Sequence, residues 1–118
     1  MNYPQPLTSP LYVGIFELDT AGTVLYTRQS QPGSSIEKNT YLVGQNFFEN
    51  VADFENMTDF RRRFKNFVSS HSSTEHFQFE CRSIKGSVPV RVLMMRAREK
   101  NESHSTDIVI IDIRKNDN

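Results

Sequence analysis

The hydrophobic pattern changes its period in the second half of the chain, and this change most constrains the fold. Phe60, Phe64 and Phe67 follow the spacing of one face of an α-helix, which predicts an amphipathic helix over residues 59–70. Residues 76–81 then alternate between polar and apolar side chains, as expected of a half-buried β-strand. The two patterns together predict a domain that combines α and β structure.

Further strands are expected on both sides of this pair of elements. Residues 11–19 and 23–27 are strand-like, and the turn signal Asp19–Gly22 between them predicts a hairpin. Residues 88–98 form a long predicted strand, and the nearly all-apolar residues 108–113 predict a final strand at the centre of the sheet. The order is strand, strand, short helical turns, one helix and three strands, so we expect an α+β domain.

The charge balance and the single cysteine argue against several classes of protein. The 118 residues suit one domain, and 14 basic side chains balance 14 acidic ones. A formal net charge of zero lacks the basic footprint of a dedicated nucleic-acid binder. Cys81 alone cannot form an internal disulfide, and the sequence has neither signal-peptide features nor an apolar run of about 20 residues. We therefore expect a cytoplasmic protein without membrane insertion.

The chain is expected to divide into an arm, a domain and a tail. Three prolines within residues 1–10 exclude a regular helix there and predict an extended N-terminal arm. Residues 11–115 form the expected domain, and residues 116–118 form a short C-terminal tail.

The run Leu42–Ala52 relates these patterns to a known family. In it a glycine is followed, after one residue, by an asparagine and two phenylalanines, and after two further residues by a Val-Ala pair. This run resembles the helical segment of PAS domains of the photoactive yellow protein type, where similar residues lead into the segment that carries the chromophore. Near the C-terminus, Ile110–Arg114 is similar to the Asp-Ile-Thr signature that closes many PAS domains, with Arg114 in place of the threonine.

This resemblance implies a fold and argues against a pigment. It implies a PAS fold, which is a five-stranded antiparallel sheet with short helices and one longer amphipathic helix on one face. In photoactive yellow protein relatives a cysteine after the two phenylalanines carries the chromophore, and that position falls on Phe54 here. The tyrosine and glutamate that hold the pigment in those relatives fall near Thr27 and Gln31. Flavin-binding relatives need a cysteine at the position of Phe47, so we expect no cofactor.

Haem, metal and catalytic sites are not expected either. Some PAS domains bind haem through a histidine on the long helix, but the predicted helix carries none within its body. His71, His76 and His104 fall in a turn, on the polar face of a strand and in a loop, without a metal-ligand spacing. The sequence shows no nucleophile–base set, activated carboxylate pair or phosphate-binding loop, so we expect that the protein is not an enzyme.

The aromatic residues are expected to lie between the helices and the sheet. They either fill this space as a core of normal density or line a small apolar cavity that accepts a ligand. The bulk of Phe54 at the chromophore position favours filling. The residues that would line such a cavity are Phe16, Thr27, Gln31, Tyr41, Phe47, Phe54, Phe60, Phe64, Phe77, Phe79 and Cys81.

Arg61, Arg62, Arg63 and Lys65 form the densest basic cluster of the chain. One interpretation is a docking patch for a phosphate, a nucleotide or an acidic partner. The other is the solvent-facing side of the amphipathic helix, where charged residues are usual. A nucleotide or nucleic-acid binder that uses this cluster ranks last among the functional hypotheses.

The leading hypothesis is a cofactor-free PAS module of a bacterial signalling system that acts by protein–protein contact. The expected partner is a second copy of the chain, another signalling protein, or both. The long strand carries apolar residues on both sides, so one side is expected to be exposed as a contact surface. The alternative is a PAS sensor that binds a small metabolite in the helix–sheet cavity. The residues expected on the contact surface are Val90, Val92, Met94, Arg96, Asp112 and Arg114.

Overall fold

The first two strands of the protein form the predicted hairpin. Strands β1 (Gly14–Leu18) and β2 (Val24–Gln29) pair antiparallel. The carboxylate of Asp19 closes the turn between them, because its Oδ1 accepts bonds of 2.9 Å from the backbone N–H groups of Ala21 and Thr23. The structure is a computed structural model, and it describes residues 13–29, 42–52, 54, 56–83, 86–100 and 105–116.

Two helical elements follow the hairpin. A single π-helical turn, η1 (Phe47–Val51), is capped by Asn46, whose side-chain oxygen accepts two backbone N–H groups at 2.9 and 3.1 Å. The longer helix, α2 (Met57–Ser69), corresponds to the predicted amphipathic helix and begins slightly earlier than the apolar spacing indicates. Asn56 caps α2 in the same way, through one bond of 3.2 Å.

Three long strands complete the sheet, namely β3 (Thr74–Ser83), β4 (Gly86–Lys100) and β5 (Ser105–Lys115). All pairings are antiparallel, and the strand order is β2-β1-β5-β4-β3. Strand β5 therefore lies at the centre, as its apolar sequence predicts. Strand β4 extends beyond the predicted residues 88–98 because it pairs with β3 at its first residue and with β5 at its last.

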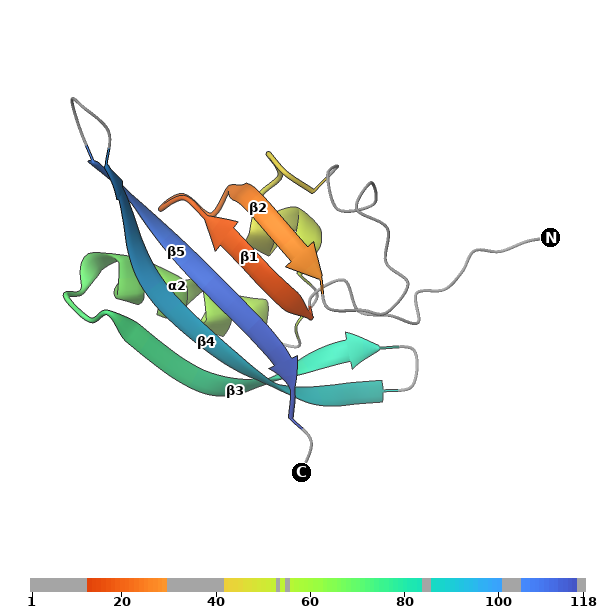
Figure 1. Cartoon of the computed structure of the whole chain (residues 1–118). Helices are drawn as coiled ribbons and strands as arrows, with labels where there is room; N and C mark the ends of the chain where they lie inside the picture. The colour runs from red at the N-terminus through yellow and green to blue at the C-terminus, as the bar shows by residue number, and fades with distance from the viewer. Residues whose placement is uncertain are drawn as a thin grey trace.

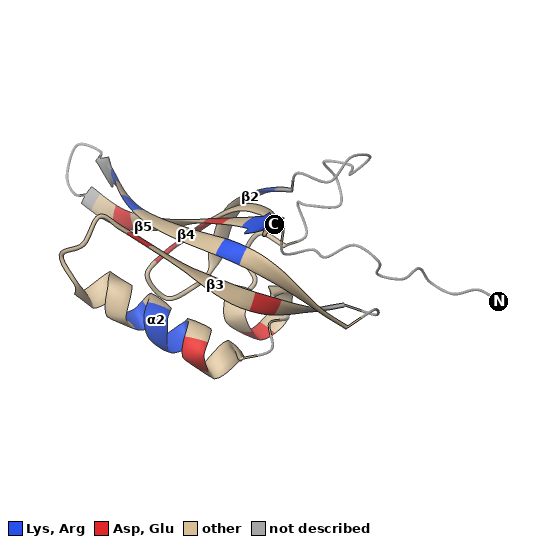
Figure 2. Cartoon of the chain, turned by 90° about the horizontal axis from the view of Figure 1, so that it is seen from below, with Lys and Arg blue, Asp and Glu red and all other residues tan. Residues whose placement is uncertain are grey.

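The molecule has two layers, a sheet and the helices that cover one of its faces. Figure 1 shows α2 and η1 behind the sheet, and the view turned by 90° in Figure 2 shows α2 on one side only. This arrangement confirms the expected α+β fold. The predicted apolar face of α2 is buried against the sheet through Phe60, Phe64 and Phe67. Within the described part of the chain, no helix has the length and apolar composition that crossing a membrane requires.

Gly22 is needed in the hairpin turn because of its backbone conformation and because of the close approach of a neighbouring side chain. A matched pair of variants separates these two reasons. Its φ is +95°, and a Cβ added there would lie 3.1 Å from Cδ2 of Phe48. Gly44 has a similar φ of +93°, but no atom lies within 4 Å of its added Cβ. Both alanine variants should lose about 1–2 kcal/mol to the left-handed backbone. We expect Gly22→Ala to lose more than Gly44→Ala in urea unfolding, and equal losses would contradict the packing role of Gly22.

Candidate functional site

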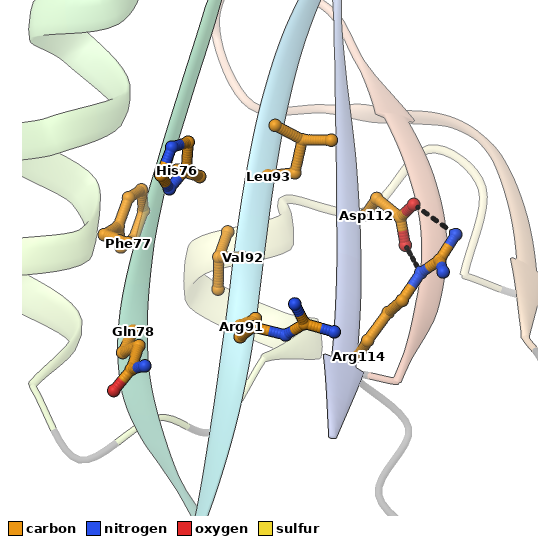
Figure 3. Close-up of a pocket in the computed structure, with 8 residues that line it drawn as sticks. All are labelled: His76, Phe77, Gln78, Arg91, Val92, Leu93, Asp112 and Arg114. Atoms are coloured by element: carbon orange, nitrogen blue, oxygen red, sulfur yellow. Dashed lines mark hydrogen bonds and ion pairs between the residues drawn. The ribbon is translucent and has the colours of Figure 1, made fainter. Parts of the chain in front are cut away.

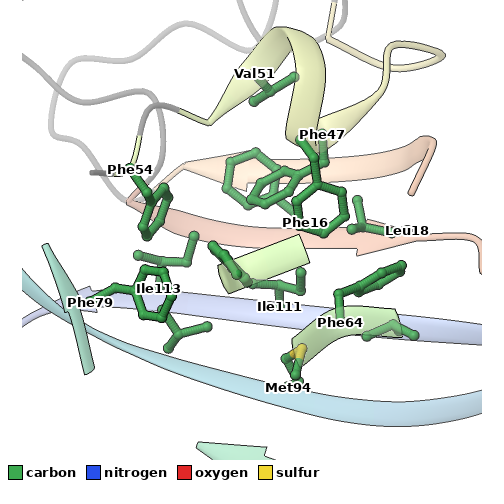
Figure 4. Packing of buried hydrophobic residues seen from close by; sticks show 14 of the residues in the cluster. Phe16, Leu18, Phe47, Val51, Phe54, Phe64, Phe79, Met94, Ile111 and Ile113 are labelled. Carbon is green, nitrogen blue, oxygen red and sulfur yellow. The ribbon is translucent and has the colours of Figure 1, made fainter. Parts of the chain in front are cut away.

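Phenylalanine rings from both layers meet between α2 and the sheet (Figure 4). Phe60 of α2 is fully buried and contacts five other rings, with centroid distances of 4.8–5.9 Å. Most of these pairs meet edge to face, which is the arrangement that ring quadrupoles favour. The five rings belong to Phe47, Phe48, Phe54, Phe77 and Phe79.

Phe54 occupies the position that the resemblance assigns to the chromophore-bearing cysteine. Its side chain is 1% exposed, and its ring centroid lies 4.8 Å from that of Phe60 and 5.7 Å from that of Phe79. Its backbone pairs with that of Cys81 on β3 in an isolated bridge. The Phe54 ring therefore occupies space within the core at this position. Its hydrocarbon side chain offers no thiol that could form a thioester with a chromophore.

The other predicted cavity residues that the structure describes also lie in this core, with Phe77 half-buried at its edge. Thr27 is buried as well, but its hydroxyl donates a 3.2 Å bond to the carbonyl of Ile15 across the hairpin. Gln31 and Tyr41, together with the predicted arm, lie outside the described residues. The buried members of the set are Phe16, Phe47, Phe54, Phe60, Phe64, Phe79 and Cys81.

Three of the residues expected on the contact surface lie in the core instead. Val90, Val92 and Met94 are fully buried, because this side of β4 faces the helices and continues the inward-facing side of β5. The expectation is therefore wrong for these three residues. The opposite side of β4, which carries Leu93 and Met95, faces outward.

Arg96, another expected contact residue, also points inward, so that expectation is wrong as well. Its guanidinium lies at the C-terminal end of α2 and donates to the carbonyls of Phe67, Ser70 and Ser72 at 2.5, 3.1 and 3.2 Å. It also lies over the Phe67 ring, 4.9 Å from the centroid. The last carbonyls of a helix lack intrahelical donors and carry partial negative charge, so a cation is favoured there. Arg96 therefore connects the helix to the sheet.

The basic cluster on α2 is largely paired with carboxylates. Figure 2 shows basic and acidic residues close together along this helix. Asp59 accepts hydrogen bonds from Arg62 and Arg63, which lie one turn further along α2. Arg61 forms an ion pair of 3.2 Å with a glutamate of η1, while Lys65 is exposed. Exposed pairs of this kind contribute about 0–1 kcal/mol each to stability. The arrangement is that of a solvated helix face.

The outer face of the sheet, opposite α2, combines apolar and charged side chains. It consists of the residues that alternate with core residues along each strand. Most of its apolar members from the three inner strands are half-buried, Ile108 on β5 is buried, and Tyr26 on the edge strand β2 is 47% exposed. The half-buried apolar members are Ile15, Leu93, Met95, Ala97 and Ile110.

A groove of about 520 Å³ crosses the outer face over β3, β4 and β5 (Figure 3). Asp112 and Arg114, the remaining expected contact residues, lie along one side of it and form two hydrogen bonds of 3.1 and 3.2 Å. The hydrogen bond and charge of Asp112 raise the pKa of the Arg114 guanidinium above its usual value. The residues that line the groove are His76, Phe77, Gln78, Arg91, Val92, Leu93, Asp112 and Arg114.

Of the β3 and β4 residues of this groove, sequence patterns predicted a site role for Phe77 and Val92 but not for His76, Gln78, Arg91 or Leu93. Arg91 carried a usable signal, because it shares a side of β4 with Leu93 and Met95. Arginine is rarely buried without a partner, so it marks that side as the one that faces water. His76 and Gln78 become its neighbours only through the register of β3 with β4.

Metal ligands do not converge in the part of the chain that the structure describes. No group of three or more His, Cys, Asp or Glu side chains in that part is placed to hold an ion. His71 and His76 are exposed there, and His104 lies outside the described residues.

Solved structures similar to this one include domains of a sensor histidine kinase and of a quorum-sensing receptor. The photoactive yellow protein domain of the sensor histidine kinase Ppr from Rhodospirillum centenum is 27% identical, with a TM-score of 0.63, and the match covers 89% of this chain and 87% of that one. The PAS domain of the Cronobacter turicensis quorum-sensing receptor RpfR, in complex with BDSF, is 17% identical, with a TM-score of 0.58 and coverage of 92% and 98%. The Drosophila melanogaster Cycle PAS-B domain with bound ethylene glycol is 14% identical, with a TM-score of 0.57 and coverage of 87% and 99%. No family model and no curated protein matches the chain.

The five-stranded antiparallel sheet with helices on one face matches these PAS structures over most of the chain. The chain has the PAS fold. Among PAS domains it resembles the photoactive yellow protein type, and Phe54 lies at the position that this resemblance assigns to the chromophore cysteine.

Proposed function

We propose that this chain is a PAS signalling module that acts by protein–protein contact through the outer face of its sheet, without a bound pigment. Its partner is a second copy of the chain, another signalling protein, or both. The observation that carries the proposal is the apolar content of the outer face, which α2 and η1 leave uncovered. Half-buried aliphatic side chains gathered on one face are typical of contact sites.

The absence of a pigment is supported by the packing around Phe54. A tethered chromophore would need a nucleophilic thiol at that position and room beside it. The Phe54 ring instead packs against Phe60 and Phe79 and is almost fully buried. A purified protein that absorbs visible light would contradict this part of the proposal.

Self-association is tested by light scattering over a range of concentrations. We expect the mass of two chains at high concentration and of one chain for Ile110→Lys, because the lysine would place a charge on the central strand of the outer face. Losing a central contact of this kind weakens association by about 30-fold or more. Val43→Lys is the matched control, since Val43 is 47% exposed before η1 and off the sheet.

Both variants should keep the circular dichroism of the parent protein. A single-chain mass for the parent at every concentration would contradict the homodimer and leave another signalling protein as the partner. A dimer that persists in Ile110→Lys and dissociates in Val43→Lys would contradict the outer face as the contact surface.

The alternative of a metabolite bound between helix and sheet would require the core to open. The centroids of the five rings around Phe60 lie 4.8–5.9 Å from its own, so a ligand at this place must displace at least one ring. A metabolite that raises the melting temperature of the parent protein, and shifts core rather than outer-face resonances, would favour this alternative.

A further inference from the structure

Two arginines occupy directly opposite positions on adjacent strands of the outer face. Arg91 of β4 pairs in register with Arg114 of β5. Like charges placed opposite each other across two strands are destabilising. Arg114 is compensated by Asp112, with which it forms two hydrogen bonds. Within the described residues the Arg91 side chain makes no hydrogen bond or ion pair, so one positive charge is left over at this point.

The surroundings of Arg91 form the groove on the outer face (Figure 3). Leu93 lies two residues along β4 and gives the groove an apolar surface, flanked by His76 of β3 on one side and Asp112 of β5 on the other. Gln78 is the cross-strand neighbour of Arg91 on β3. The groove therefore combines an uncompensated guanidinium, further hydrogen-bond donors and a patch of aliphatic surface.

This combination selects the chemistry of a ligand. A guanidinium presents a planar fork of donors that matches a carboxylate through two parallel hydrogen bonds. The only carboxylate among the groove residues, Asp112, is already engaged by Arg114. An incoming carboxylate would thus meet net positive charge, and an aliphatic group beside it would cover Leu93. A free inorganic anion has no group that could use the apolar surface.

We propose that this groove binds an acidic segment of a partner protein, with Arg91 anchoring a carboxylate and Leu93 contacting a neighbouring aliphatic side chain. The proposal rests on the proposed function, since the partner docks on the outer face. The segment belongs to a different signalling protein, because a second copy docked by the same face would bring the same surplus positive charge to the groove.

The test uses a short fluorescent peptide of alternating glutamate and leucine with blocked ends, titrated with the full chain at low ionic strength. We expect saturable binding, with amide shifts confined to His76, Gln78, Arg91, Leu93 and the Asp112–Arg114 segment. Arg91→Ala should weaken binding about tenfold, the size expected for one charge-assisted hydrogen bond. A peptide with glutamine in place of glutamate should bind to the parent protein at least as weakly as the glutamate peptide binds to Arg91→Ala.

Arg28→Ala is the matched control for the loss of charge. Arg28 lies on the same face, on the edge strand β2, and is exposed. Its removal should change affinity less than about twofold, the effect of a distant surface charge. Equal losses in Arg28→Ala and Arg91→Ala would overturn the site, because they would indicate non-specific attraction.

Two further outcomes would also overturn the proposal. Inorganic phosphate that displaces the peptide at equal concentration would show a small-anion site. A dimer that dissociates in Arg91→Ala, with no peptide binding by the monomer, would show that a second copy occupies the groove. That last result would still support contact through the outer face, so it separates the failure of this inference from the failure of the proposed function.

Discussion

Phe60→Ala is expected to remove a large share of the free energy of unfolding of the protein at 25 °C. Phe60 is fully buried and contacts five other rings, so its removal opens a cavity at the centre of the core. Truncating a buried phenylalanine to alanine costs about 3–5 kcal/mol. The total free energy of unfolding of a domain is about 5–15 kcal/mol. Urea unfolding followed by circular dichroism measures the loss.

Phe77→Ala is the matched control for this prediction. Phe77 lies at the edge of the same cluster and is half-buried, and among the described aromatic rings it contacts two, those of Phe60 and Phe79. It should lose less than half as much free energy of unfolding as Phe60→Ala, because more of its surroundings can relax or hydrate. Similar losses in the two variants would contradict the central position of Phe60.

Elements that depend on residues close in sequence could be predicted well. The hairpin follows from the turn at Asp19–Gly22, whose aspartate bonds to backbone groups within the same turn. The buried face of α2 follows from the spacing of its three phenylalanines. The central place of β5 follows from its apolar sequence, because a strand covered on both edges carries few polar residues. The identification as PAS needed the run Leu42–Ala52 in addition.

The side of β4 that faces outward could not be predicted from apolar content. Val90, Val92 and Met94 compete with Leu93 and Met95, and both sets suit a buried strand face. The position of α2 over one face decides between them, and no local pattern contains that information. Charge gave conflicting signals, because Arg91 and Arg96 lie on opposite sides of the same strand.

Arg96 resolves this conflict through contacts that are distant in sequence. Its side chain lies on the inward side of β4, beyond the point where the packed rings end. There it reaches the carbonyls of Phe67 in the last turn of α2 and of Ser70 and Ser72 just after the helix, which are 24–29 residues earlier in the chain. A long side chain can place its charged group at such a point while its stem stays packed. Sequence separation of this size explains why the strand pattern alone indicated a surface residue.

Arg96→Ala is expected to destabilise the protein by about 2–4 kcal/mol. The variant loses hydrogen bonds to three carbonyls, the contact with the Phe67 ring and a 3.7 Å ion pair with Asp107, which also pairs with Arg98. A hydrogen bond to a charged group contributes about 1.5–3 kcal/mol, and a cation over a ring adds about 0.5–1 kcal/mol. The side chain is only 16% exposed, so water replaces these bonds incompletely. Hydrogen exchange should show the largest loss of protection in the last turn of α2.

Arg98→Ala separates this effect from the loss of any arginine on β4. Arg98 is 56% exposed and pairs with Asp107 at 2.9 Å, so its removal should cost about 0–1 kcal/mol. Arg96→Lys should recover only part of the loss, because one ammonium group cannot match the planar fork that reaches several carbonyls. Equal destabilisation by Arg96→Ala and Arg98→Ala would show that the end of α2 is held by its own backbone bonds. The helix would then be anchored to the sheet by its phenylalanines alone.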